Sequence, residues 1–534
     1  MRAVSLVPLP VVLPLLGAGV ALALGRWDRA QRAVSLVVLM ATVAIAAVLL
    51  VNADADGPLV VWIGGWPEPL GISLVADRLS ALMLLVSATV TLAVLVYSLG
   101  QGVADGTRNT PVSIYHPTYL VLSAGVANAF LAGDLFNLFV GFEVLLAASY
   151  VLMTLTGTSE RIRAGTTYVV VSLLSSLLFL VAIALVYAAT GTVNLAQLSG
   201  RLADLPDGVS LVLQLLLLTV FSIKAAVFPL SAWLPDSYPT APAPVTAVFA
   251  GLLTKVGVYA IIRTQTLLFP DSPLTDLLMW AALLTMIVGI LGAVAQSEIK
   301  RMLSFTLVSH IGYMVFGVAL ATAAGLAGAI FYVVHHITIQ TTLFLVAGLV
   351  ERRGGSTSLS RLGGLARASP ILGVLFFVPA MNLGGIPPFS GFLGKVGLLQ
   401  AGVGSGLPLA YVLVAGGVVT SLLTLYAVAK AWNLAFWRAA PAEILEPASA
   451  VDAREAVRAR GAGGTPRNPA SDQPAPSPPV ALPAAMVAPT AGLVVAGVAL
   501  SVVAGPLFAV ADRAAADLLE RSPYVESVLP RGAP

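Results

Sequence analysis

The chain has 534 residues, of which 58% are hydrophobic and only 10% are charged. Soluble domains are about 45–50% apolar and about 25% charged, so this composition excludes an ordinary water-soluble protein and makes the lipid bilayer the natural solvent. The net charge of +3 gives no indication of nucleic-acid binding, and the lack of cysteine excludes disulfide frameworks and thiolate metal sites.

Runs of about 20 apolar residues, each a predicted transmembrane helix, follow one another along the chain. The first run, Ser5 to Leu24, resembles a signal peptide, but a second run starts at Ala33, which favours a retained first helix. The expected fold class is all-α, a polytopic membrane protein of about fourteen transmembrane helices. The expected spans are residues 4–24, 33–51, 79–99, 117–132, 135–157, 164–189, 209–230, 244–268, 274–296, 302–321, 323–350, 370–402, 407–437 and 483–509.

The loops predict the orientation of these spans, because Lys and Arg are enriched on the cytoplasmic side. If both termini lie outside, most loop Lys and Arg residues fall inside, among them Arg161, Arg163, Lys300 and Arg301. We therefore expect a multi-pass protein of the cell membrane with both termini outside. Residues 438–482 are rich in Pro, Ala, Arg and Gly, which is typical of a solvated cytoplasmic linker.

Lysine is placed unusually in this sequence. The chain has 5 lysines and 23 arginines. Four of the lysines fall inside expected spans: Lys224, Lys255, Lys395 and Lys430. A charge at the centre of a membrane helix costs about 2.5–3.5 kcal/mol even on insertion scales. Lysine, unlike arginine, can lose its proton when buried, so these positions indicate proton transfer.

Two of the lysines lie beside predicted helix breaks. Lys224 precedes a proline-rich segment that begins at Pro229, and Lys395 follows the run GGIPP that ends at Pro388. Proline interrupts the hydrogen-bond ladder of a helix, and broken helices occur at membrane depth where they line a hydrated cavity. The repeated plan predicts two related halves. Lys430, near the end of its span, is better explained by snorkelling towards the interface.

Other ionisable residues extend this pattern. Glu143 is the only carboxylate well inside its helix, and we expect Lys224 to be its cationic partner. Lys255 lies in the next helix after Lys224. His335 and His336 lie in the middle of a span, and neighbours on a helix point about 100° apart, so we expect only one to face the polar interior. We favour His336, which shares a face with Gln340. His310 and His116 are weaker candidates, and Asp134 is interpreted as an N-cap.

No cofactor or metal is expected. The sequence has four histidines and few clustered carboxylates, and no glycine-rich phosphate loop follows a predicted strand.

At these residues the chain resembles a known superfamily. The segment KAAVFPLSAWLPDSYPTAPAPVTAVFAGLLTKVGVYAIIR, from Lys224 to Arg263, is similar to the signature of the proton-translocating antiporter-like subunits. These include the membrane-arm subunits of respiratory complex I and the large subunits of Mrp-type sodium/proton antiporters. The segment GDLFNLFVGFEVLLAASYVLM most resembles the D-type subunit of Mrp antiporters. Ala250 and Lys255 also favour the D-type over the long A-type subunit, and Gln340 stands where some relatives have lysine.

The resemblance implies two inverted five-helix repeats with broken helices 7 and 12. The expected units are residues 1–110 with helices 1–3, 111–268 and 269–437 as the two repeats, 438–482 as the linker, and 483–534 with helix 14 and a C-terminal tail. It also implies a proton relay, not an enzyme active site, through Glu143, Lys224, Lys255, the histidine helix and an outlet at Lys395.

The function expected is that of a proton-translocating subunit of a multisubunit monovalent cation (Na⁺)/H⁺ antiporter. Its partners would be the other subunits, membrane lipid, protons and Na⁺, with no nucleic acid. One alternative is a proton-pumping subunit of a quinone oxidoreductase or membrane-bound hydrogenase. A second alternative, a stand-alone carrier of an organic solute, would need a tailored polar cavity, whereas the sequence offers only titratable groups.

Overall fold

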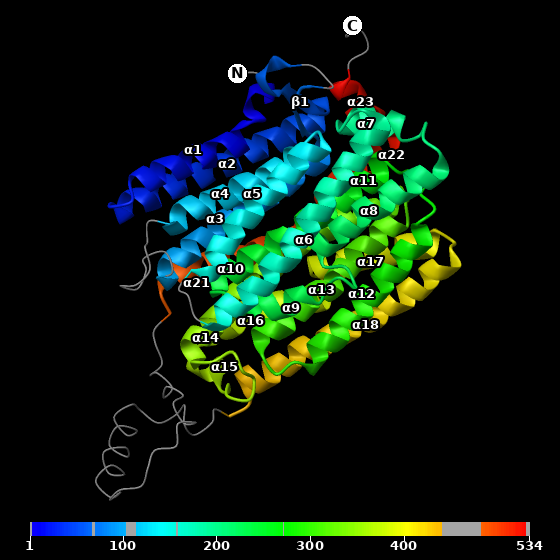
Figure 1. Cartoon of the computed structure of the whole chain (residues 1–534). Coiled ribbons are helices and arrows are strands. Elements are labelled where there is room, and N and C mark those ends of the chain that lie inside the picture. The colour runs from blue at the N-terminus through cyan, green and yellow to red at the C-terminus, as the bar shows by residue number, and fades with distance from the viewer. Residues whose placement is uncertain are drawn as a thin grey trace, which may run out of the picture.

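The computed structural model describes residues 3–66, 70–102, 114–155, 159–270, 272–439 and 482–529. Within these ranges the chain forms a bundle of long, roughly aligned helices (Figure 1). The first half of the chain contains η1 (Ala3–Leu6), α1 (Leu9–Ala23), α2 (Asp28–Asp56), η2 (Ile63–Gly65), α3 (Arg78–Gln101), α4 (Tyr115–Leu131), α5 (Leu135–Thr154), α6 (Ser159–Thr190), α7 (Leu195–Arg201), α8 (Asp207–Ala225), α9 (Trp233–Ser237), η4 (Tyr238–Thr240), α10 (Ala243–Val248), η5 (Phe249–Leu253) and α11 (Thr254–Leu267).

The second half continues the same architecture. It contains α12 (Thr275–Ala295), α13 (Ile299–Ala319), α14 (Ala323–Gly354), α15 (Leu365–Ala368), α16 (Pro370–Gly384), α17 (Ser390–Gly404), α18 (Pro408–Trp432), η6 (Asn433–Trp437), α21 (Ala484–Val502), α22 (Ala504–Glu520) and α23 (Ser522–Val528). The expected linker lies almost wholly outside the described residues. The division of the chain into two inverted repeats stays a prediction.

The helices have the length and composition of membrane spans. Among the described residues, 12 helices are long and apolar enough to cross a membrane. The two remaining expected spans correspond to α4, which is 17 residues long, and to the pair α16 and α17. Helices satisfy their backbone hydrogen bonds internally, which the bilayer requires. The predicted polytopic helical fold is therefore confirmed, while the total of fourteen spans stays a prediction.

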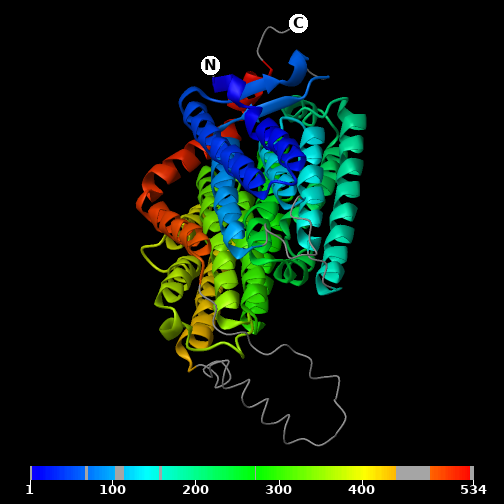
Figure 2. The ribbon, with the colours of Figure 1, turned by 90° about the vertical axis from the view of Figure 1, so that its left-hand side faces the viewer.

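Two short strands depart from the all-α prediction. β1 (Leu59–Trp62) and β2 (Ser73–Ala76) pair antiparallel, with Leu59 opposite Ala76 and Trp62 opposite Ser73. They lie at the end of the bundle that also holds η1 and α23, as Figure 1 shows. Both ends of the chain thus lie at one end of the bundle (Figures 1 and 2), and the side of the membrane that this end faces stays a prediction.

The two expected helix breaks are present. Helix α8 ends at Ala225 because Ala226 adopts a left-handed conformation (φ 60°) and Pro229 follows, so the predicted span 209–230 extends too far. Helix α16 ends at Gly384, Gly385 is also left-handed (φ 83°), and α17 begins at Ser390. Left-handed residues commonly terminate helices and provide partners for their last carbonyls.

The C-terminal region differs from the predicted single span 483–509. Helix α21 ends at Val502, and the amphipathic helix α22 leaves it at an angle, as Figure 2 shows in orange and red. Arg513 and Arg78 both bind Asp54, at 2.7 and 2.9 Å, and Arg78 also pairs with Asp517. These ion pairs hold α22 against the neighbouring ends of α2 and α3.

Burial separates the helices into an inner and an outer set. The share of buried residues in an apolar 18-residue stretch differs from helix to helix. This share is 100% for α14 and for the α10–α11 segment and 94% for α13, but only 28% for α2 and α21. The outer helices present apolar side chains to lipid. The inner helices carry the polar groups, which is the arrangement expected of ionisable residues in membrane proteins.

A buried ion pair joins two of these helices near the end that holds the termini. Arg263 of α11 lies 2.6 Å from Asp77, and the two side chains are 4% and 8% exposed. Asp77 also caps α3 by accepting a hydrogen bond from the Ser80 N–H. Arg263 packs against the rings of Tyr259 and Tyr524, so the pair is enclosed by α3, α11 and α23.

We expect Arg263→Met to destabilise the protein by about 3–5 kcal/mol, because it leaves the Asp77 carboxylate buried without its counter-ion. Arg301→Met is the matched control. Arg301 pairs with Asp236, but these side chains are 46% and 65% exposed, so the loss should be at most about 1 kcal/mol. Thermal unfolding in mild detergent measures both. Equal effects of the two substitutions would contradict the assignment of Arg263–Asp77 as the stabilising pair.

Candidate functional site

The site starts where α5, α6 and α8 meet. Glu143 accepts a hydrogen bond from the Ser176 hydroxyl, and the Lys224 amine donates to the same hydroxyl at 2.9 Å. No ion pair between Glu143 and Lys224 occurs within the described parts of the chain, so the predicted pairing is made through a hydroxyl bridge. Lys224 also lies over the Phe142 ring, 5.1 Å from its centroid.

Lys224 occupies the last turn of α8, immediately before the break. The carbonyl end of a helix carries a partial negative charge, which favours a cation there. The break therefore does two things for this lysine. It places the lysine at the carbonyl end of the helix, and it ends the helix in the interior of the bundle.

Lys255 is the next buried lysine and has no exposed surface. It follows η5, a wide helical turn, and its amine donates to the Ala250 carbonyl of that turn at 2.5 Å. Such wide turns leave carbonyl groups without their usual helical partner and are frequent at functional sites. Within the described residues, no side-chain partner of Lys255 is found.

Three histidines gather between α13 and α14. The rings of His310 and His336 are 5.1 Å apart, and His310 Nδ1 lies 2.8 Å from the Tyr332 hydroxyl. His335 Nδ1 lies 3.0 Å from the Ser390 hydroxyl at the start of α17. His335 and His336 thus both lie among polar groups, in contrast to the expectation that only one would. The reason is that α14 is enclosed on all sides, with α13 facing one histidine and α17 facing the other.

Lys395 ends the row on the far side of the histidines. Its amine donates to the carbonyls of Leu383 and Gly384, at 3.1 and 3.3 Å, and to the Ser421 hydroxyl at 3.0 Å. The two carbonyls belong to the last turn of α16, so Lys395, unlike Lys224, is hydrogen-bonded to carbonyl groups of its helix break. The Tyr313 ring lies below the amine, at 5.3 Å.

Close backbone approaches bring these helices together. A side chain at Gly257 of α11 would meet the backbone of Ala225 in α8 at 2.6 Å. A side chain at Gly391 of α17 would meet the His335 ring at 3.0 Å. The predicted site residues therefore lie along one row from α5 to α17, which is half-buried at Glu143 and buried at its lysines and histidines.

Some groups in this row were missed by the sequence interpretation. Ser176 was not singled out, and His310 was ranked low although it lies between His336 and Tyr332. Lys430 behaves as expected, since its amine donates to the carbonyls of Val294 and Gln296 at the end of α12. Gln340 donates to the Leu303 carbonyl of α13, so it holds two helices together.

Asp134, outside the row, has the predicted capping role. Its carboxylate accepts a hydrogen bond from the Asn137 N–H at 2.6 Å at the start of α5. Burial raises the pKa of the Asp134 carboxyl to about 6, and its bonds to the N–H groups of Asn137 and Phe136 oppose that rise. Among the described residues, no group of three or more acidic, histidine or cysteine side chains is arranged to hold a metal ion.

The row can be compared with proteins of known family. A family model described as NADH:quinone oxidoreductase/Mrp antiporter, TM matches residues 132–424, which is more than half of the chain. The chain belongs to this family. The match starts just before α5 and ends within α18, so it contains Glu143, Lys395 and every group between them in the row.

Relatives and solved structures agree with the family. The D-type Na⁺/H⁺ antiporter subunit of Alkalihalophilus pseudofirmus is 40% identical over 436 residues, covering 81% of this chain and 87% of the relative. A chain of the Mrp complex from Dietzia sp. has a TM-score of 0.87 and 35% identity, covering 99% of this chain and 100% of that chain. The predicted resemblance to the D-type Mrp subunit is confirmed. A chain of Thermus thermophilus respiratory complex I, with a TM-score of 0.77 and 24% identity over 96% of this chain and 99% of that one, shares the fold.

The histidine cluster generates a prediction about water. Both ring nitrogens of His336, Nε2 of His310 and Nε2 of His335 are buried without a protein hydrogen-bond partner. Buried polar atoms are almost always hydrogen-bonded, to water where no protein group is available. We expect ordered water within hydrogen-bond distance of both His336 nitrogens in a high-resolution map of the protein in lipid. A dry environment around His336 in such a map would contradict this expectation.

Proposed function

We propose that the protein is a proton-translocating subunit of a multisubunit monovalent cation (Na⁺)/H⁺ antiporter. The observation that carries this proposal is the row of titratable side chains, which starts at the half-buried Glu143 and continues through the buried Lys224, Lys255 and histidines to Lys395, in a chain similar to D-type antiporter subunits. No bond is made or broken in the proposed cycle, so the protein acts as one part of a transporter, not as an enzyme. Its partners would be the other subunits of the complex in the cell membrane.

The bridge at Ser176 supports a proton switch. Burial disfavours the charged form of a lysine, while a nearby carboxylate favours it. Glu143 reaches Lys224 through one rotatable hydroxyl, so a small displacement of α5 or α6 changes how strongly the carboxylate stabilises the ammonium. A closer carboxylate makes Lys224 take up a proton, and a more distant one makes it release the proton.

The histidines supply the connection to the second half. A neutral imidazole accepts a proton on one nitrogen and donates one from the other. His336 lies beside His310, and His335 contacts α17, which carries Lys395. A proton on one lysine repels positive charge on the histidines, so protonation changes at the two ends of the row are coupled. Proton influx would then drive Na⁺ export through neighbouring subunits.

The same row could serve a redox-driven pump of the quinone oxidoreductase or hydrogenase type. The family description includes NADH:quinone oxidoreductase, and the fold is shared with a complex I chain. The identity of 40% to a D-type antiporter subunit, against 24% to the complex I chain, favours the antiporter. Subunits that co-purify in mild detergent separate the two functions: small membrane subunits for the antiporter, and iron–sulfur and flavin subunits for the pump.

Lys224→Ala tests the relay. We expect Na⁺-dependent ΔpH in everted vesicles to fall by at least about 100-fold, the contribution typical of a lost proton-transfer group, while the complex still assembles. The matched control is Lys430→Ala, which also removes a lysine from a membrane helix but touches only backbone carbonyls. It should keep most of the activity. Normal transport by an assembled Lys224→Ala complex would disprove the proposed relay.

Lys395→Arg tests proton release at the far end. Arginine keeps the charge but does not deprotonate at accessible pH, so we expect this variant to transport nearly as poorly as Lys395→Ala. Lys430→Arg serves as the control for the larger guanidinium. The assay is again Na⁺-dependent ΔpH, at matched amounts of assembled complex. If arginine supports most of the activity, Lys395 is a fixed charge and the outlet lies elsewhere.

A further inference from the structure

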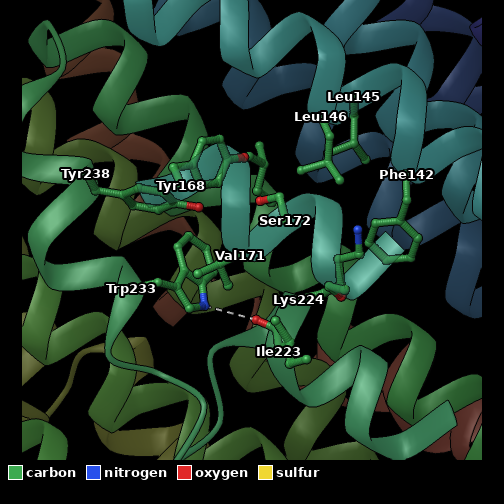
Figure 3. A pocket seen from close by; sticks show the side chains of 12 residues that line it. Phe142, Leu145, Leu146, Tyr168, Val171, Ser172, Ile223, Lys224, Trp233 and Tyr238 are labelled. Carbon is green, nitrogen blue, oxygen red and sulfur yellow. Dashed lines mark hydrogen bonds between the residues drawn. The ribbon is translucent and has the colours of Figure 1, made fainter. Parts of the chain in front are cut away.

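A small cavity lies beside Lys224, between α5, α6, α8 and the segment that follows the first break. Its polar lining includes Tyr168, Ser172, Ser175, Lys224 and Tyr238. The cavity volume is about 20 Å³, which is room for a water molecule, and a buried water needs two to four polar partners of this kind. Figure 3 shows the Lys224 amine on the side of Phe142 and the hydroxyl of Tyr238 pointing inward from the opposite side.

Tyr238 is the polar group of this lining that lacks a partner. The residue is fully buried, and its hydroxyl has no hydrogen-bond partner within the protein. Its ring is fixed by the rings of Trp233 and Phe249, whose centroids are 5.6 and 5.8 Å away. A rigidly held phenol would leave its hydroxyl unsatisfied, which is unfavourable inside a protein, unless water bonds to it. The cavity is where that water fits.

Tyr238 also stands between the cavity and the surface. Two residues before it, Asp236 is 65% exposed and pairs with Arg301 at 2.8 Å, at the end of the bundle that carries α9. Between them, the buried Ser237 hydroxyl also lacks a protein partner. Two unpartnered hydroxyls, on consecutive residues, therefore separate the exposed ion pair from the Lys224 cavity along the chain.

We propose that the Tyr238 hydroxyl, through water held in this cavity, passes protons between Lys224 and the solvent at the α9 end of the bundle. The hydroxyl accepts a proton on its oxygen from a water on the Ser237 side and gives its own proton to the cavity water. That water passes a proton to the neutral Lys224 amine, and the phenol returns to its neutral form. This inference rests on the proposed function, because it supplies the protons that the relay would carry.

The test compares variants of the whole complex in everted vesicles. Tyr238→Phe removes only the hydroxyl and keeps the ring packing. Ser172→Val fills the cavity and removes a polar partner of the water. Tyr115→Phe is the matched control, because Tyr115 is a buried phenol of α4 that does not line the cavity. The readouts are the rate of Na⁺-dependent ΔpH, the ratio of rates in H₂O and D₂O, and the amount of assembled complex.

We expect Tyr238→Phe to transport at least about tenfold more slowly, with a larger H₂O/D₂O ratio because proton passage becomes limiting. Ser172→Val should also be slower, and Tyr115→Phe should match the wild type. A wild-type rate for Tyr238→Phe would overturn the inference. A slower rate with an unchanged isotope ratio would also overturn it, because that result indicates a packing role.

Lys224→Ala separates this inference from the proposed function. If Lys224→Ala abolishes transport while Tyr238→Phe is normal, the relay stands and only the access route through Tyr238 is wrong. If Lys224→Ala itself transports normally, the relay fails, whatever Tyr238 does.

Discussion

The cost of holding ammonium groups inside a membrane protein determines much of this architecture. A charge at membrane depth costs several kcal/mol unless it is bonded, and a regular helix has no free carbonyl to bond it. Each lysine of the row is placed where a helix is irregular: Lys224 at the end of α8, Lys255 after the wide turn η5, and Lys395 against the last turn of α16. Interrupting a helix is therefore the means by which the fold accommodates a lysine whose proposed role is to gain and lose a proton.

The same lysines have few carboxylate partners, and this matters for the proposed proton transfer. A buried lysine locked to a carboxylate would stay charged, whereas carbonyl and hydroxyl oxygens stabilise the ammonium more weakly. Lys255 and Lys395 bind only such oxygens among the residues that the structure describes. Only Lys224 has a carboxylate in reach, and a hydroxyl stands between them. Under the proposed function, these weaker partners allow the lysines to take up and release protons.

The sequence was sufficient to predict the membrane fold and the two breaks, because apolar runs and prolines are local signals. It also singled out most of the side chains that the structure brings together, while their role as a proton relay stays a prediction. It could not reveal contacts between distant segments. Ser176 is one of many serines in apolar helices, and its role depends on where α6 crosses α5 and α8. Which of His335 and His336 faces a proton path stays a prediction, and the sequence could not show that His335 contacts Ser390 of a distant helix. Helix α22 was not predicted as a separate helix. The hydrogen bond that holds it in place joins Arg513 to Asp54, two residues about 460 positions apart in the sequence.

Glu143 shows why this chain should not act alone. Its side chain is only half-buried, although it lies midway along a membrane helix. One carboxylate oxygen is bonded to Ser176, but a glutamate that is partly open to lipid would still carry an appreciable desolvation cost. A neighbouring protein of the complex that covers this face with a polar or basic group would remove that cost. Since Glu143 reaches Lys224 through a single hydroxyl, the neighbour would also gain a direct influence on the first proton of the row. Under the proposed function, the partly exposed Glu143 would thus be a physical route for coupling between subunits.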